Sequence, residues 1–553
     1  MSARLTFVDL FCGCGGFTLG MQRAGFDCLA ALDFNPQAIA TLKQNLPTIP
    51  HVLERDLIQF APAQLSELIK TKSVDVIVGG PPCQGFSTAR QVDGANHGER
   101  LKEDPRRLLY REFLRYVDFF QPRIFVMENV LGIRTAAGGA YFTAVQKEAR
   151  ELGYRVHSQI EDAWELGVPQ KRRRQLIIGV RNDLPGYFLP TLNPAPRAEP
   201  RTWLGAAIGD LPKLRAGGGE DEHEYDLERR EKHLRGSDGD TAKNYLFNVL
   251  EIHKATKLTN HVARPHSERD LRDFALLKEG ENSATAMRDR GVKFEFPYDK
   301  SSFKDRYTRQ SRWHPCSTIV AHLSKDGLMF IHPTQNRSLT PREAARIQSF
   351  PDWFRFPEAR THSFRLIGNA VPPLIGEAVG LAVKKFLNIS VETNSTSSHS
   401  RSKRGTQREH QRNETHSVRH DARVNGTRWN ASLPADRPSA AIELQKIARL
   451  DRRAMQALRK EEFLRCWRAL LFLCPELHPD NALDHGDAEE PWNTKGSLFP
   501  GLSENRYARS GWPVALELIG REAWRRHKAK QITDEELYCS AAQIAGLQQL
   551  NKK

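Results

Sequence analysis

The chain has 553 residues, about three to four domains' worth, and its 39% hydrophobic and 8% aromatic content excludes a wholly disordered protein. Lys and Arg number 82 against 67 Asp and Glu, and the net charge of +15 fits a polyanionic partner as well as a plain basic soluble protein. Eight irregularly spaced Cys form no disulfide framework, no apolar run is long enough for a membrane span, and the first residues lack a secretory pattern, so we expect a cytoplasmic protein.

Residues 1–181 alternate between two kinds of pattern. Short apolar runs predict strands at 6–11, 28–33, 74–80, 123–130 and 174–180. Helical spacing of apolar residues predicts helices at 35–46, 111–120 and 141–153. Asn35 is expected to cap the first of these, with Pro36 at its first position. This alternation predicts an α/β fold with a mostly parallel sheet covered by helices on both faces.

The rest of the chain divides by composition. Residues 182–336 are polar and irregular and predict a separate subdomain, while 337–387 regain regularity, with Thr340 capping a helix and a closing amphipathic helix at 373–387. Residues 388–435 are rich in Ser, Thr, Asn, Arg and His and predict a disordered basic linker. Residues 436–553 predict a small helical domain whose role the sequence does not reveal.

The first predicted strand runs into a glycine turn that begins at Phe11 and includes Gly13 and Gly15. Such a turn before a helix lets a ligand approach the backbone closely. Asp33 ends the next strand, where a carboxylate can bind both ribose hydroxyls of an adenosyl cofactor. Asp56, near a third strand, is placed to accept from an adenine amine. A glycine turn common to any α/β sheet is the alternative interpretation.

The segment 80–87, Gly-Pro-Pro-Cys-Gln-Gly-Phe-Ser, follows a predicted buried strand. Cys83 therefore stands at the carboxyl edge of the sheet, where open α/β folds bind ligands, and the prolines fix its direction. The strand ending at Glu128 brings a carboxyl group to the same edge. A thiol and a carboxyl group beside an adenosyl cofactor suit covalent methyl transfer. Cys12 and Cys14 have no second Cys/His pair nearby, so we expect no metal.

With these residues in place, the chain resembles the DNA cytosine-5 methyltransferases over residues 5–387. The matching stretches are 9–26, 79–87, 104–115, 127–130, 167–180, 337–354 and 367–373. The resemblance implies a class I S-adenosylmethionine-dependent methyltransferase fold, Rossmann-like, with an inserted target-recognition region at 182–336. It is silent on 388–553.

The resemblance also implies a set of catalytic roles. Cys83 supplies the thiolate that adds to carbon 6 of cytosine, since carbon 5 alone is too weak a nucleophile. Glu128 holds or protonates ring nitrogen 3. Gln170, Arg172 and Arg174 match the family's glutamine and alternating arginines, which are expected to hold the flipped nucleotide.

Further roles follow from the same resemblance. The methyl donor S-adenosylmethionine is expected to touch Phe11, Gly13, Gly15, Asp33, Asp56, Pro82 and Asn369. Ser87 is expected to help orient the substrate, and the polar loop 87–103 is long enough to act as a lid. A target base inside duplex DNA cannot reach such a pocket, so base flipping is required.

Three functions remain open to comparison. The first is a site-specific methyltransferase of double-stranded DNA in a restriction-modification or epigenetic system, associated with the nucleoid. The second keeps the chemistry on tRNA, against which the large 182–336 region argues. The third is a non-catalytic DNA-binding protein, against which the complete set of Cys83, Glu128 and Arg172 argues. Residues 436–553 are candidates for docking a cognate restriction endonuclease or another partner.

Overall fold

The computed structural model describes residues 4–82, 108–184, 192–236, 239–296, 307–325 and 327–402, with side chains as far as 387. Met1–Arg181 and Leu189–Lys385 form one compact unit, so the polar region expected at 182–336 shares a unit with the α/β segments on either side of it. Cys83, Ser87, the loop 87–103 and the predicted domain 436–553 lie outside the described residues.

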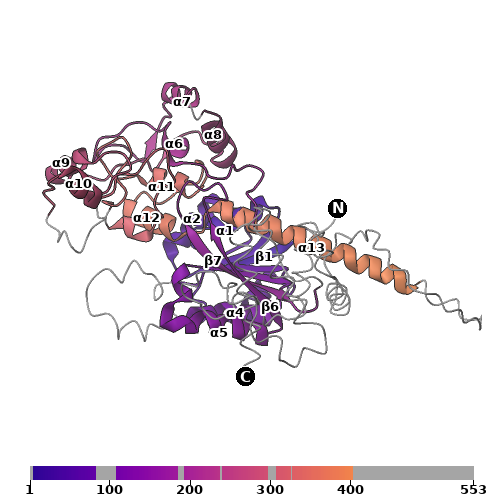
Figure 1. Ribbon diagram of the computed structural model, residues 1–553. Helices are drawn as coiled ribbons and strands as arrows, with labels where there is room; N and C mark the ends of the chain where they lie inside the picture. Colours follow the sequence, from indigo (N-terminus) through magenta and orange to yellow (C-terminus); the bar gives the residue numbers. More distant parts are fainter. Residues whose placement is uncertain are drawn as a thin grey trace, which may run out of the picture. The chain divides into compact units, whose positions relative to one another are not determined.

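A seven-stranded sheet in the order β3-β2-β1-β4-β5-β7-β6 forms the centre of the unit. Its strands are β1 (Thr6–Leu10), β2 (Asp27–Asp33), β3 (His51–Glu54), β4 (Val76–Gly79), β5 (Ile124–Asn129), β6 (Tyr154–Asp162) and β7 (Arg173–Arg181). All neighbours pair in parallel except β7, which is antiparallel to both β5 and β6. The mostly parallel α/β sheet is confirmed, and Figure 1 shows helices on both sides of it.

The helices that accompany the sheet begin largely where their sequences predict. They are α1 (Gly16–Arg23), α2 (Pro36–Asn45), α3 (Pro62–Ile69), α4 (Leu109–Phe120), α5 (Ala140–Glu151), α11 (Pro341–Ile347), α12 (Arg360–Asn369) and α13 (Pro373–Ser402). Asn35 caps α2 by accepting from the backbone N–H groups of Gln37 and Ala38. α13 extends past 387, where the sequence predicted its end, since no Gly or Pro follows before Gly405.

Strand β6 was absent from the sequence-based prediction. Buried and half-buried residues alternate only from Tyr154 to Ser158, and the polar Ser158 and Glu161 occupy buried positions that apolar residues usually fill, so the sequence hides the strand. The strand pairs with β7 along its whole length, from Tyr154 opposite Arg181 to Asp162 opposite Arg173. No helix separates these two strands, and this direct connection makes β7 antiparallel in an otherwise parallel sheet.

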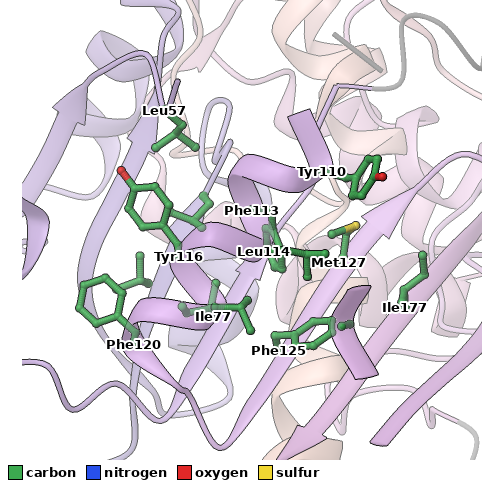
Figure 2. Close-up of a cluster of buried hydrophobic side chains, with 14 of the residues drawn as sticks. Leu57, Ile77, Tyr110, Phe113, Leu114, Tyr116, Phe120, Phe125, Met127 and Ile177 are labelled. Carbon is green, nitrogen blue, oxygen red and sulfur yellow. The ribbon is translucent and has the colours of Figure 1, made fainter. Parts of the chain in front are cut away.

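Aromatic side chains of α4 pack one face of the sheet, as Figure 2 shows. Phe113 meets Phe125 of β5 edge-to-face with ring centres 5.9 Å apart, and both rings are fully buried. Tyr116 lies beside them and donates to the backbone carbonyl of Phe60 at 2.9 Å. This cluster fixes β4 and β5, the strands that lead to the candidate site.

Helices α1 and α13 touch through glycines. A Cβ at Gly20 would lie 2.4 Å from the carbonyl oxygen of Pro373, and one at Gly376 would lie 2.9 Å from that of Phe17. No side chain fits in this contact, so the two backbones approach directly. The start and the end of the α/β segments are thereby joined.

The region between β7 and α11 consists of short elements. They are α6 (Leu204–Ile208), β8 (Glu222–His223), α7 (Leu227–Leu234), α8 (Gly239–Asn244), β9 (Leu258–Thr259), α9 (Glu268–Leu276), α10 (Ser283–Arg290), a π turn at Tyr245–Val249, and 3₁₀ turns at Ile252–Lys254 and Ala321–Ser324. A small apolar cluster around Phe274 and Tyr307 forms part of its core. Figure 1 shows these elements gathered around α11. Two further 3₁₀ turns, Leu131–Arg134 and Ala136–Gly139, lie earlier in the chain, between β5 and α5.

Charged residues at the centre of α11 tie this region down. The fully buried Arg346 donates to Asp352 at 2.8 and 2.6 Å and to Asp210, on the segment after α6, at 2.5 Å. Thr340 caps α11 in a capping box with Glu343, as predicted.

One stretch among the described residues, Arg360–Leu387, is long and apolar enough by composition to cross a membrane, which the sequence analysis did not expect. Within the fold 83% of that apolar window is buried. The core helices of globular proteins meet the same criterion, so the stretch is weak evidence for a membrane segment.

Candidate active site

Two loops meet where the strand order reverses, after β1 and after β4. β1 lies between β2 and β4, so its carboxyl end adjoins the crevice in which open α/β sheets bind ligands. Phe11, Gly13 and Gly15 in the first loop have φ values of 58°, 56° and 91°. The left-handed conformation is costly for Phe11, and such strain is found where a backbone is shaped for a ligand. A Cβ at Gly15 would meet Leu42 Cδ1 at 2.3 Å, so this position requires glycine.

Asp33 at the end of β2 is held against this loop. Its Oδ2 accepts from the N–H of Gly13 and its Oδ1 from that of Asn35, both at 2.9 Å. Burial raises the pKa of the Asp33 carboxyl group above its ordinary value. Asp56 is exposed beyond β3 and accepts from the N–H of Ile58 at 2.9 Å. The structure therefore brings Asp33 to the glycine turn, as the sequence predicts, and leaves Asp56 accessible near the next strand.

Two apolar side chains at this edge were missed by the sequence analysis. Phe34 and Ile58 are 65% and 55% exposed, the first directly after Asp33 and the second two residues after Asp56. Large apolar groups exposed beside fixed carboxylates are typical of a site for a flat, partly apolar ligand. Their positions next to the acidic residues were the available signal.

The segment that follows α12 covers the glycine turn from the other side. Cys14 Sγ donates to the carbonyl oxygen of Leu366 at 3.8 Å, and a Cβ at Gly16 would lie 2.1 Å from that of Val371. Asn369, between them, is exposed. Residues more than 350 positions apart in the chain thus meet at the glycine turn, and the contact of Asn369 with the methyl donor stays a prediction.

Glu128 lies near the end of β5, beside the second loop, and only 8% of it is exposed. Arg174 Nε on β7 lies 3.0 Å from Glu128 Oε1. A Cβ at Gly80 would lie 3.3 Å from Glu128 Oε2, so the carboxylate adjoins the segment that leads through the half-buried Pro82 to Cys83. Asn129 Nδ2 donates to the carbonyl oxygen of Pro81 at 3.3 Å and ties the two strand ends together.

Gln170 and Arg172 precede β7 and are buried rather than open to a ligand pocket. Arg172 donates to the carbonyl oxygens of Ile319 and Ala370, both at 2.9 Å. Gln170 donates to Gln348 Oε1 at 2.6 Å. Both residues therefore join the start of β7 to segments that lie 147, 178 and 198 positions further along the chain.

The described cysteines, Cys12, Cys14, Cys28 and Cys316, are all buried thiols. Burial raises the pKa of each, for Cys14 to about 12, so none is a thiolate at neutral pH. Within the described ranges no three His, Cys, Asp or Glu side chains are arranged to hold a metal ion. Cys316 is fully buried.

A buried acid in β1 was also missed. Asp9 is 1% exposed and accepts from Thr18 Oγ1 of α1 at 2.6 Å. Desolvation, reinforced by the nearby Asp33 and opposed by the hydrogen bond from Thr18, raises the pKa of Asp9 to about 7. Asp9 lies in β1, the strand that leads into the glycine turn. The only signal in the sequence was one acidic residue within an apolar run.

Comparisons with known proteins agree with this geometry. The family model described as C-5 cytosine-specific DNA methylase matches residues 5–385. The chain is 34% identical to the type II methyltransferase M.DdeI of Desulfomicrobium norvegicum over 403 residues, covering 70% of this chain and 90% of that protein. It is 33% identical to the type II methyltransferase M1.HphI of Haemophilus parahaemolyticus, covering 69% and 87%. A crystal structure from E. coli, assigned as a prophage-encoded DNA modification methyltransferase, superposes with a TM-score of 0.53 at 27% identity, covering 69% and 99%.

Proposed function

The chain belongs to the C-5 cytosine-specific DNA methylases and is a DNA cytosine-5 methyltransferase, and on that premise we propose how its residues act on a cytosine of duplex DNA. The observation that carries the proposal is the position of Glu128, held by Arg174 at 3.0 Å next to the Gly80–Pro82 segment that directly precedes Cys83 in the chain. A carboxyl group and a thiol at one sheet edge are the pair that the chemistry needs.

The methyl donor fits the edge formed by β1, β2 and β3. S-adenosylmethionine supplies a methyl group bonded to a positively charged sulfur. We assign its ribose to Asp33 and its adenine to the faces of Phe34 and Ile58, with Asp56 facing the exocyclic amine. The exposed apolar pair supports this fit, since a ring inserted there removes both side chains from water. Phe11, Gly13, Gly15, Pro82 and Asn369 complete the proposed contacts.

Catalysis begins with addition of the Cys83 thiolate to carbon 6 of the cytosine. Glu128 donates a proton to, or shares one with, ring nitrogen 3, which neutralises the negative charge that the added thiolate brings into the ring. The ring is then an enamine, and its carbon 5 is nucleophilic. Carbon 5 would then take the donor's methyl carbon as the methyl–sulfur bond breaks, with the bonding electron pair leaving on the sulfur as a neutral thioether. Loss of the proton from carbon 5 to water or hydroxide releases Cys83 and restores the aromatic ring.

Three residues at or just before the start of β7 hold this arrangement: Gln170, Arg172 and Arg174. Arg174 neutralises and orients Glu128. Gln170 and Arg172 fix the loop from which Lys171 and Arg173 project as exposed cations. Ser87 keeps its proposed role in orienting the substrate. A cytosine within a duplex must be flipped out to reach Cys83, and the exposed cations are suited to hold the backbone phosphates that remain.

The biological setting follows from the relatives. Both M.DdeI and M1.HphI are named type II methyltransferases, which supports a role in restriction-modification or in an epigenetic system acting in the compartment that holds the DNA. We propose residues 182–336 as the target-recognition region and 436–553 as a site for a partner such as a cognate endonuclease.

Tritium transfer from labelled S-adenosylmethionine to duplex DNA tests the reaction, with Cys83→Ser as the control. Wild type is expected to label DNA and the variant to label none. Bisulfite sequencing of the product identifies the methylated site. A duplex with 5-fluorocytosine at that site should become covalently bonded to the wild type, because fluorine cannot leave as the carbon 5 proton does. Labelled DNA without any covalent complex would refute the thiolate mechanism.

A further inference from the structure

Trp313 is an exposed aromatic side chain that the proposed chemistry leaves without a role. It is 51% exposed, although its indole ring is largely apolar. It lies in the polar region before α11, in a turn formed by Ser311–His314 in which the N–H of Trp313 donates to Ser311 Oγ at 3.3 Å. Tryptophan is enriched among the residues that carry most of the binding energy at interfaces.

The backbone on both sides of Trp313 is fixed. The carbonyl oxygen of Arg312 accepts from the N–H of Gly205 at 2.8 Å, and that of His314 accepts from the N–H of Leu204 at 3.1 Å. Both donors belong to α6, so the indole projects from a short loop that is pinned before and after it. A ring held in this way loses little conformational entropy when it binds a ligand.

The charge beside Trp313 is compensated. The guanidinium of Arg312 lies 5.8 Å from the centre of the indole ring. The same guanidinium donates to Glu279 at 3.1 and 2.8 Å, and the carboxylate also accepts from the N–H of Arg312. Arg312 therefore acts as a fixed support for the ring more than as a free cation.

The turn is continuous with the active-site strand. Three residues after Trp313, Cys316 exchanges backbone hydrogen bonds with the segment before β7: its N–H donates to Pro169 at 2.9 Å and its carbonyl oxygen accepts from Lys171 at 2.8 Å. The chain then leads to Ile319, whose carbonyl oxygen accepts from Arg172. Three extended residues span at most about 11 Å, so the backbone of Trp313 lies within about 11 Å of Cys316, which pairs with the segment that carries the exposed cations Lys171 and Arg173.

We propose that Trp313 is a DNA-contacting residue that packs its indole ring on the duplex bound over the active site. The inference rests on the proposed function, since it takes the cations before β7 to face the DNA backbone. Bases and sugars offer apolar faces to such a ring, and one base–aromatic stack contributes about 5- to 100-fold in affinity. Because Arg312 is already paired with Glu279, the contact adds stacking rather than phosphate neutralisation.

Kinetics with mixed-sequence genomic DNA test the proposal in the full chain. Trp313→Ala is expected to lower kcat/KM for DNA by about 5- to 100-fold, while Trp313→Phe retains most of it. The KM for S-adenosylmethionine should stay unchanged in both. The slope of log affinity against log salt should also stay unchanged, since no phosphate contact is removed. Leu68→Ala, at a 42% exposed apolar residue of α3, is the matched control and should behave as wild type.

Photo-crosslinking gives a readout that does not depend on turnover. DNA substituted with bromodeoxyuridine is irradiated in complex with the wild type, and crosslinked peptides are identified by mass spectrometry. We expect a peptide that contains Trp313. Unchanged kcat/KM in a folded Trp313→Ala enzyme, crosslinks confined to other segments, or a dimer that dissociates on this substitution would each overturn the proposal. Absence of methyl transfer by the wild type would instead refute the proposed function, and the crosslink would still report on Trp313.

Discussion

Arg174 Nε on β7 lies 3.0 Å from Glu128 Oε1 on β5, and each side chain is about one-tenth exposed, at 12% and 11%. The two residues reach this geometry because β7 runs antiparallel to β5 and places Leu176 opposite Glu128, so Arg174 lies two residues further along the same face. The antiparallel direction of β7 therefore sets the position of the proposed catalytic carboxyl group.

Replacing Arg174 by Gln should lower kcat by about 10²- to 10³-fold, because Glu128 loses the charge that orients it. The KM for S-adenosylmethionine should change little, since the proposed donor site lies at other strands. Single-turnover methylation measures the chemical step. A matched control is Arg111→Gln, whose 55% exposed side chain pairs with Glu148 on α5. Equal rates for the two variants would contradict a role for Arg174 in catalysis.

Phe34→Ala and Ile58→Ala should each raise the dissociation constant of S-adenosylmethionine by about 10-fold or more. Each removes apolar surface that the adenine would cover, worth about 1.5–3 kcal/mol when fully buried. Isothermal titration calorimetry in the absence of DNA measures the effect. Because both side chains are exposed in the free protein, its free energy of unfolding should stay near wild type. Unaltered affinity in both variants would exclude the proposed adenine position.

Arg346→Ala should lower the free energy of unfolding by about 3–5 kcal/mol, since the buried Asp210 and Asp352 would keep only their longer ion pairs with Arg230 at 3.4 Å and Arg342 at 3.8 Å. Urea unfolding followed by circular dichroism gives the value. Arg235→Ala is the surface control: that side chain is 80% exposed, pairs with Glu231 at 3.7 Å, and should cost less than about 1 kcal/mol. Similar losses for both would show that the buried ion pairs of Arg346 contribute no more to stability than the exposed pair of Arg235.

Asp9 makes stability depend on pH. Its folded-state pKa of about 7 exceeds the unfolded value of 3.8, so the folded state binds the proton more tightly. The free energy of unfolding should therefore fall as pH rises from about 4 to about 7, and stay level above that. Asp9→Asn removes this titration, and the difference between variant and wild type should grow over the same interval. A difference that is constant with pH would refute the raised pKa.

Local signals were enough to predict the elements that local hydrogen bonds define. Asn35 with Pro36 and Thr340 with Pro341 mark the starts of α2 and α11 as the structure has them. The buried apolar runs of β1, β4 and β5 and the alternation with helices also predicted the mostly parallel sheet. Asp33 was recognisable because it ends the apolar run of β2.

Other features depend on contacts that no local pattern records. Gln170 meets Gln348 from 178 positions away, so its buried position could not be read from a run of basic residues. β6 stayed hidden because polar residues fill its buried positions. The roles of Cys83 and Ser87, outside the described residues, stay predictions.

The contact between the glycine turn and the segment 366–371 has a consequence for synthesis on the ribosome. At about 5–20 residues per second, translation takes roughly 20–70 s to proceed from Gly16 to Val371. During that time a nascent polypeptide presents the turn without the residues that enclose it. A fragment released earlier lacks this contact, so the glycine turn is enclosed only in chains translated nearly to the end of this unit.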